Sequence, residues 1–109
     1  MTVSRQPASS PIVALDYEIA QEQATALGRL GRALEAALAA LADHDRRGQK
    51  ADDIQANLVQ EAGHALWCFM VQRECCGLRD PRPVMRDYGV PQDVQNRMGI
   101  FNGMRRRRR

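Results

Sequence analysis

The apolar residues in the first half of the chain recur at spacings of three and four, and this pattern constrains the fold more than any other feature. They are Ile12, Leu15, Ile19, Leu27, Leu30, Leu34, Leu38 and Leu41. At about 100° per residue they share one stripe of an α-helix, whereas Glu18 and Arg29 point away from it. Ser10-Pro11 supplies an N-cap and a proline for the first helical position. The pattern predicts a helix over residues 11–44, about 50 Å long.

A second amphipathic segment follows a polar turn over residues 45–51. Asp52 is expected to cap its first turn, and Gly77 suits the left-handed position that closes a helix. The apolar stripe of this segment comprises Ile54, Leu58, Val59, Ala62, Ala65, Leu66, Phe69, Met70 and Cys76. Two long amphipathic helices, 11–44 and 52–76, joined by a short connection predict an antiparallel hairpin.

The middle of the second predicted helix is apolar nearly all round, because Trp67, Cys68 and Val71 fall outside its main stripe. A helix of this kind is covered on two sides. We expect the second cover to come from the C-terminal segment, from a second protomer, or from both.

The C-terminal third has the signals of two short helices. Asp80-Pro81 predicts the start of one that Gly89 closes, and Val90-Pro91 the start of another that Gly99 closes. We expect both to fold back over the Trp67 face. The apolar residues available for this contact are Val84, Met85, Tyr88, Val90, Val94 and Met98.

Two glycines, Gly28 and Gly31, lie in the interior of the first predicted helix, where each costs about 1 kcal/mol relative to alanine. Gly31 projects onto the apolar stripe and Gly28 onto its edge. A missing side chain at these positions favours close helix–helix packing, and a ligand-binding notch is the alternative. The residues expected to carry packing and interaction are Leu27, Leu30, Gly31, Leu34, Trp67 and Phe69.

A hairpin with two small helices leaves part of the long stripe uncovered, and exposed apolar strips mark association sites. A twofold homodimer that makes a four-helix bundle is the simplest closure. We therefore predict an all-α fold, an antiparallel two-helix hairpin plus two short C-terminal helices, that dimerises in this way. The expected division is a disordered N-terminus over 1–10, a single helical domain over 11–101 and a basic disordered tail over 102–109.

The charge of the chain is concentrated at its C-terminus. The net charge is +3 from sixteen basic and thirteen acidic residues, but five of the basic residues form the run Arg105–Arg109. Without that run the acidic residues outnumber the basic ones, so the body is mildly acidic. The three cysteines are an odd number and two are adjacent, which favours reduced thiols and a cytoplasmic location. No secretory signal or membrane-spanning segment is expected.

Few residues suggest chemistry. His64 and Cys68 are four apart on one helical face, a spacing that can hold a metal, but further ligands would be needed and half-buried side chains are the favoured interpretation. Neither a glycine-rich phosphate loop nor a nucleophile elbow occurs in the sequence. We therefore predict that the protein is not an enzyme and has no cofactor.

An arginine on the main apolar stripe needs a partner, because an unpaired guanidinium there would be costly. This residue is Arg73, and the charged residues around the helix end are Glu74, Arg79 and Asp80. We expect an ion-pair network that clamps the Gly77 turn, in which Asp80 or a residue of the first helix is the partner of Arg73. A pocket for an anion or an acidic peptide is the alternative.

Residues 84–98 (VMRDYGVPQDVQNRM) resemble a helix-turn-helix, in which the second helix lies in the DNA major groove. Met85 and Gln95 depart from the small and aliphatic residues usual at their positions, and Asp93 would repel phosphate. Two short capping helices are the favoured interpretation. The arginine tail can neutralise phosphates or contact an anionic membrane surface, although a solvated end is expected. The residues that would contact nucleic acid are Gln92, Asn96, Arg97, Arg105, Arg106, Arg107, Arg108 and Arg109.

Three stretches together carry a family resemblance: LDYEIAQEQATALGRLGRALEAALAAL (15–41), ALWCFMVQRECCGLRD (65–80) and DYGVPQDVQNRMG (87–99). They resemble a family of short α-proteobacterial proteins of unknown function. The resemblance covers about three quarters of the chain and omits the first ten residues and the arginine tail. It implies a bacterial cytoplasmic origin and one domain, and it assigns no site residue.

The function expected from these observations is that of an oligomeric helical-bundle scaffold, adaptor or regulatory protein. It would act through protein–protein contacts, as a homodimer with a further protein partner that the sequence does not identify. The alternative is a nucleic-acid-binding protein that uses residues 84–98 and the arginine tail, which the acidic body does not support.

Overall fold

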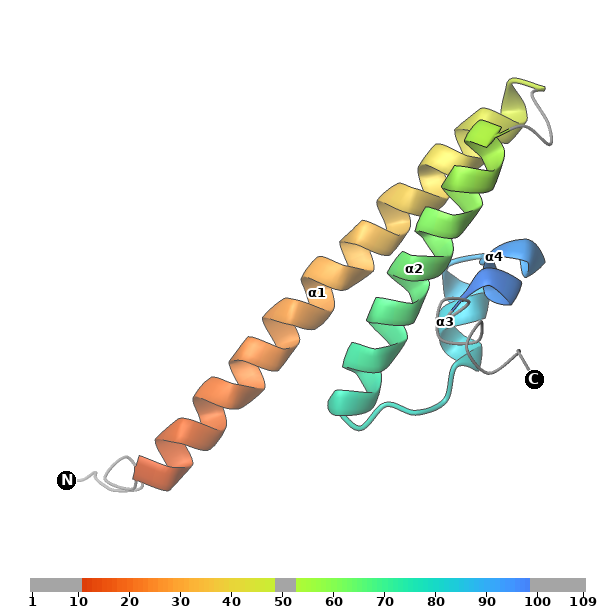
Figure 1. Ribbon diagram of the computed structural model, residues 1–109. Coiled ribbons are helices and arrows are strands. Elements are labelled where there is room, and N and C mark those ends of the chain that lie inside the picture. The colour runs from red at the N-terminus through yellow and green to blue at the C-terminus, as the bar shows by residue number, and fades with distance from the viewer. Residues whose placement is uncertain (1–10, 49–52, 99–109) are drawn as a thin grey trace, which may run out of the picture.

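The computed structural model describes residues 11–48 and 53–98, and all regular secondary structure in these two ranges is α-helical. The helices are α1 (Pro11–Arg46), α2 (Asp53–Cys75), α3 (Arg82–Asp87) and α4 (Gln92–Arg97), as Figure 1 shows. The prediction of an all-α chain is confirmed. The expectations for residues 1–10 and 99–109, and for the cap at Asp52, lie outside the described residues.

Helices α1 and α2 form the predicted antiparallel hairpin and lie side by side along the length of α2 (Figure 1). Helix α1 continues to Arg46, two residues beyond the predicted end. Asp43 accounts for part of this extension, because its carboxylate pairs with Arg46 at 3.0 Å and with Arg47 at 2.8 Å. Such pairs at spacings of three and four stabilise the last turn of a helix.

The end of α2 is closed at Gly77, as the sequence predicts. Gly77 adopts φ +85°, the left-handed conformation that glycine reaches without steric cost. The Leu78 N–H donates to the Arg73 carbonyl at 2.8 Å and the Gly77 N–H to the Glu74 carbonyl at 3.0 Å. This Schellman pattern satisfies carbonyls that the helix end would otherwise leave free.

A glycine in the left-handed conformation also separates the two short helices. Both helices are shorter than predicted. Gly89 has φ +60°, and the Val90 N–H donates to the Met85 carbonyl at 3.0 Å. Each short helix has six residues. Helix α4 packs against α2, and Val84, Val90 and Val94 complete the core of the hairpin.

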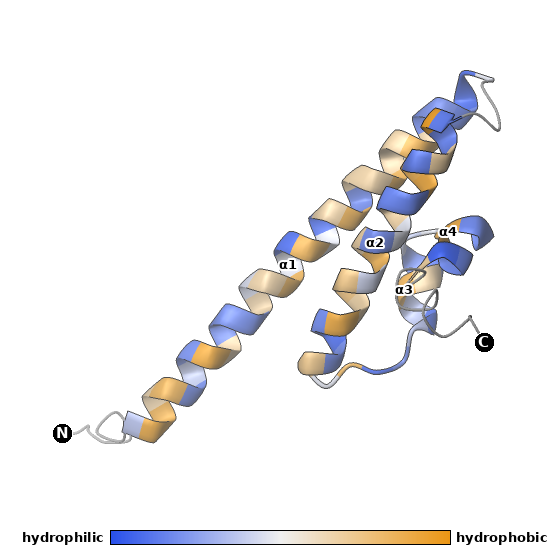
Figure 2. Ribbon diagram, in the orientation of Figure 1, coloured by the Kyte–Doolittle hydropathy of each residue, from blue (hydrophilic) through white to orange (hydrophobic). Residues whose placement is uncertain are grey.

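The N-terminal part of α1 has no partner helix in the described chain. Helix α1 has 36 residues and α2 has 23, so α1 extends past the end of α2 (Figure 1). We call residues 11–26 the α1 arm. Several segments of this arm are orange in Figure 2, the colour of hydrophobic residues. Among the described helices, none is both long and apolar enough to cross a bilayer.

Candidate interaction site

The α1 arm exposes large apolar side chains that a folded monomer normally covers. Ile12 is 70% exposed, Leu15 55% and Ile19 47%. Val13 and Tyr17 are also exposed, but at about 100° per residue they lie on the other side of the arm. Because Ile12, Leu15 and Ile19 share one side of the helix within about two turns, they form a contiguous apolar strip, which is typical of a surface that binds another molecule.

The strip is the continuation of the stripe that forms the core further along α1. Leu34 and Leu41 lie on that stripe and are 0% and 2% exposed, because α2 covers them. The stripe continues toward the N-terminus with the same spacing, but α2 ends too early to reach it. The exposed strip is therefore a direct result of the difference in length between the two helices.

The residues predicted to carry packing lie mostly inside the monomer. Gly31, Leu34 and Phe69 are buried, and Leu27 and Leu30 are half-buried against the same core. Their contacts are made within one chain. On α1, the large apolar residues that stay exposed are those of the arm, which lie further toward the N-terminus.

Trp67 is half-buried. It lies one helical turn from Gly63, the position on α2 that α4 contacts. The C-terminal segment thus supplies a second cover for α2 close to the place where the sequence indicated one.

Gly31 allows a close approach, but by aromatic side chains rather than by another backbone. A Cβ atom at this position would lie 3.0 Å from the Tyr88 hydroxyl and 3.3 Å from Phe69 Cε1. The two rings meet edge to face, with centroids 5.4 Å apart and planes at 61°. Gly28 has only the end of the Arg32 side chain nearby, at 3.4 Å. Of the two glycines, Gly31 is thus the one that packing requires.

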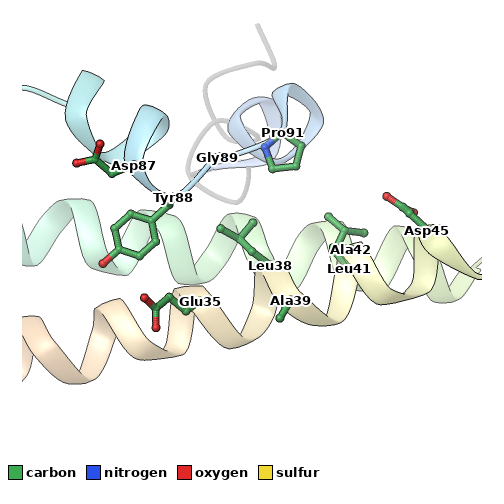
Figure 3. Close-up of a pocket in the computed structure, with 10 residues that line it drawn as sticks. All are labelled: Glu35, Leu38, Ala39, Leu41, Ala42, Asp45, Asp87, Tyr88, Gly89 and Pro91. Atoms are coloured by element: carbon green, nitrogen blue, oxygen red, sulfur yellow. The ribbon is translucent and has the colours of Figure 1, made fainter.

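Tyr88 divides a groove between α1 and the turn that joins α3 to α4. The larger part has a volume of about 680 Å³, and Figure 3 shows Tyr88 directed from the turn toward α1. The smaller part, about 360 Å³, lies on the other side of the ring and includes Gly28 and Gly31. The residues that line the larger part are Glu35, Leu38, Ala39, Leu41, Ala42, Asp45, Asp87, Tyr88, Gly89 and Pro91.

The lining of this groove is apolar with three carboxylates, but two of the three have partners in the protein. Asp87 pairs with Arg86 at 3.0 Å, and Asp45 accepts a hydrogen bond from Gln55 Nε2 at 3.1 Å. The groove therefore offers little free charge to a ligand, and the α1 arm is the stronger candidate for binding.

Helix α4 approaches α2 closely at Gly63, a contact that the sequence analysis did not predict. A Cβ atom there would lie 2.9 Å from Arg97 Cβ and 3.0 Å from the Arg97 carbonyl carbon. Gly63 is buried in the interior of α2, where glycine is unfavourable by about 1 kcal/mol relative to alanine. That cost was the available signal, as it was for Gly31.

The possible metal pair, His64 and Cys68, consists of neighbouring side chains on one face of α2. Cys68 Sγ lies 3.6 Å from His64 Nε2. Within residues 11–48 and 53–98, no group of three or more histidine, cysteine or acidic side chains is arranged to hold an ion. Cys75 is exposed at the end of the helix. Two side chains do not make the closed four-ligand site typical of structural zinc.

The charged residues at the end of α2 are connected differently from the expected network. Arg73 Nη2 donates to the main-chain carbonyl of Asp80 at 2.8 Å, and the Asp80 carboxylate instead pairs with Arg82 at 2.9 Å. Glu74 and Arg79 are exposed and form no ion pair with the described residues. The clamp at the Gly77 turn therefore depends on a main-chain acceptor rather than on a second charge.

Asp80 is held in its charged form by Arg82. The Arg82 side chain and its backbone N–H both donate to Asp80 Oδ1 at 3.0 Å. These hydrogen bonds lower the pKa of Asp80 from 3.8 to about 2. A carboxylate that accepts the N–H two residues later forms an Asx turn, which here leads the chain into α3.

The residues of the helix-turn-helix-like segment point in different directions. Gln92 and Asn96 are exposed and bonded to each other, the Gln92 Nε2 donating to Asn96 Oδ1 at 3.0 Å. Arg97 is half-buried against Gly63. Helix α4 therefore presents two of its three expected contact residues to solvent, and Arg105–Arg109 lie outside the described residues.

The described chain is a helical hairpin with two capping helices and one unpartnered arm. It belongs to a family of unknown function, DUF6665, whose family model matches residues 3–106. The match extends further at both ends than the predicted resemblance and includes Arg105 and Arg106. No curated protein and no solved structure gave a significant match.

Proposed function

We propose that this protein is a self-associating helical scaffold, which acts through protein–protein contacts and uses the α1 arm as its association surface. The observation that carries the proposal is the exposure of Ile12, Leu15 and Ile19 on one strip of α1. In a homodimer, α1 and α2 of two copies supply the four helices of a bundle.

The energetic argument rests on the water-exposed area of the arm. Full burial of a leucine or isoleucine side chain is worth about 1.5–3 kcal/mol. Leu15 and Ile19 are each about half exposed, so covering them in both copies of a dimer contributes roughly 4 kcal/mol. That gain lowers the dissociation constant of the dimer by about a thousandfold.

Light scattering coupled to size exclusion tests the proposal with the full chain. We expect the wild type to have twice the 12.2 kDa mass of one chain. Leu15→Gln combined with Ile19→Gln should shift it to the mass of one chain, since glutamine preserves helix propensity but removes the apolar area.

The matched control is Val13→Gln combined with Tyr17→Gln, which removes exposed apolar area from the other side of the same arm and should leave the mass unchanged. Circular dichroism of all variants establishes that the helices persist. A wild-type mass of one chain at every concentration would refute self-association.

A further inference from the structure

We infer that the occupant of the α1 arm is α1 of a second copy, paired antiparallel about Ala26, so that each arm lies along the exposed alanine flank of its partner's α1. This inference rests on the proposed function and adds to it the direction, the register and the contact surface of the dimer.

The first support is a series of residues at intervals of seven along α1. It runs through Ile12, Ile19, Ala26, Ala33 and Ala40. Residues seven apart share one face of a helix that packs against another. Ile12, Ile19, Ala33 and Ala40 are exposed, and Ala26 is half-buried. This face is therefore accessible both on the arm and, at Ala33 and Ala40, on the part of α1 that runs beside α2.

The order of sizes along this face selects the direction. Its N-terminal end has large side chains and its C-terminal end has alanines. A parallel pair would place isoleucine on isoleucine and alanine on alanine, which crowds one end and leaves a gap at the other. An antiparallel pair centred on Ala26 places Ile12 against the partner's Ala40 and Ile19 against the partner's Ala33. Large side chains then meet small ones, the arrangement that fills a helical interface without voids.

The second support is the charge on the flank beside this face. Glu18 and Glu22 lie on the N-terminal side of Ala26, and Arg29 and Arg32 lie on the C-terminal side. No ion pair joins any of these four side chains to another described residue. At about 100° per residue, all four fall on the same side of the helix.

The antiparallel register gives each of these charges an opposite partner. It places Glu22 within a helical turn of the partner's Arg29, and Glu18 within a turn of the partner's Arg32. A parallel pair would place this flank of the two helices on opposite sides of the interface, so none of the four charges would meet an opposite partner. Charges at the edge of an interface fix register and suppress wrong pairings more than they add affinity. The charge order and the size order thus select the same direction independently.

Exchange of the charges tests the register in the full-length chain. One variant carries Glu18→Arg and Glu22→Arg, and the other carries Arg29→Glu and Arg32→Glu. In a homodimer of either variant, like charges face each other at all four pairs. We therefore expect the dissociation constant of each variant's dimer to rise by tenfold or more. An equimolar mixture pairs every changed residue with an opposite charge and should return to within a few-fold of the wild type.

Sedimentation velocity over a range of concentrations measures these constants, and circular dichroism verifies the fold of each surface variant. Two failures are distinguishable. A wild type that remains a single chain refutes the proposed function together with this inference. A wild-type dimer whose variants associate equally well, or whose mixture stays as weak as its components, overturns the antiparallel register and leaves self-association standing.

Discussion

Gly63 of α2 and Arg97 of α4 are in backbone contact, with space for a hydrogen atom but not for a methyl group. Gly63→Ala would place a Cβ atom 2.9 Å from Arg97 Cβ. The nearest atoms include main-chain atoms of α4, which cannot rotate away as a flexible side chain does. Forced overpacking costs about 1–3 kcal/mol, which exceeds the gain of about 1 kcal/mol in helix propensity. We expect a net loss in the free energy of unfolding, measured by urea denaturation.

Gly28→Ala is the matched control for this prediction. Its Cβ would meet only the end of the Arg32 side chain, at 3.4 Å. The same substitution should therefore raise stability by up to about 1 kcal/mol. A Gly63→Ala protein as stable as Gly28→Ala would contradict the close packing of α4 on α2.

Tyr88 is predicted to hold the α3–α4 turn against the hairpin through its ring. Tyr88→Ala removes the edge contact with Phe69 and opens the space beside Gly31, and we expect a loss of about 1–3 kcal/mol for this half-buried aromatic side chain. Tyr88→Phe keeps the ring and should cost less than about 1 kcal/mol. Thermal unfolding followed by circular dichroism compares the two, and equal losses would show that the hydroxyl rather than the ring is responsible.

The ionisation of Asp80 should depend on Arg82. The pKa of Asp80 is lowered to about 2, mainly by hydrogen bonds from Arg82. Since the folded pKa lies below the ordinary value, the associated stabilisation is present above pH 3.8 and is lost as the pH falls toward 2. In Arg82→Ala, the pKa should move back toward 3.8. A titration of the Asp80 carboxyl by NMR measures both values, and an unchanged pKa in the variant would assign the shift to another cause.

Nucleic-acid binding through α4 predicts a different outcome from non-specific binding by the tail. We expect any mobility shift of a DNA probe to disappear when Arg105–Arg109 are deleted. Five phosphate contacts would also make the affinity fall roughly several hundredfold between 50 and 200 mM salt. A shift that survives deletion of the tail and is lost in Gln92→Ala with Asn96→Ala would instead support recognition by α4.

Most of the fold could be predicted from local patterns. The three-and-four spacing of leucines predicted α1 to within two residues at its C-terminal end, and Gly77 and Gly89 marked helix ends because they occupy left-handed positions. These features depend on the backbone and on near neighbours in sequence. The short helices were predicted too long, because their caps shorten each of them to six residues.

The candidate site was harder to predict from the sequence. It depends on the length of α1 relative to α2 and on contacts between segments that are distant in the sequence. The sequence indicated an uncovered strip but not its position, which follows from the point where α2 ends along α1. The contact of Gly63 with Arg97 joins residues from different elements, and no local pattern predicts which glycine a neighbouring helix will approach. Arg73 was expected to need a charged partner, whereas a main-chain carbonyl serves it.

Amide hydrogen exchange of the full chain at several protein concentrations tests the role of the α1 arm most directly. Residues 11–22 of the arm are all exposed in the described monomer, so their backbone hydrogen bonds open easily when the chain is alone. If the arm is the association surface, its protection rises steeply with protein concentration, whereas protection of the Leu66 region of α2 changes little. Equal exchange of the arm at all concentrations, in samples that light scattering shows to be dimeric, would place the association surface elsewhere.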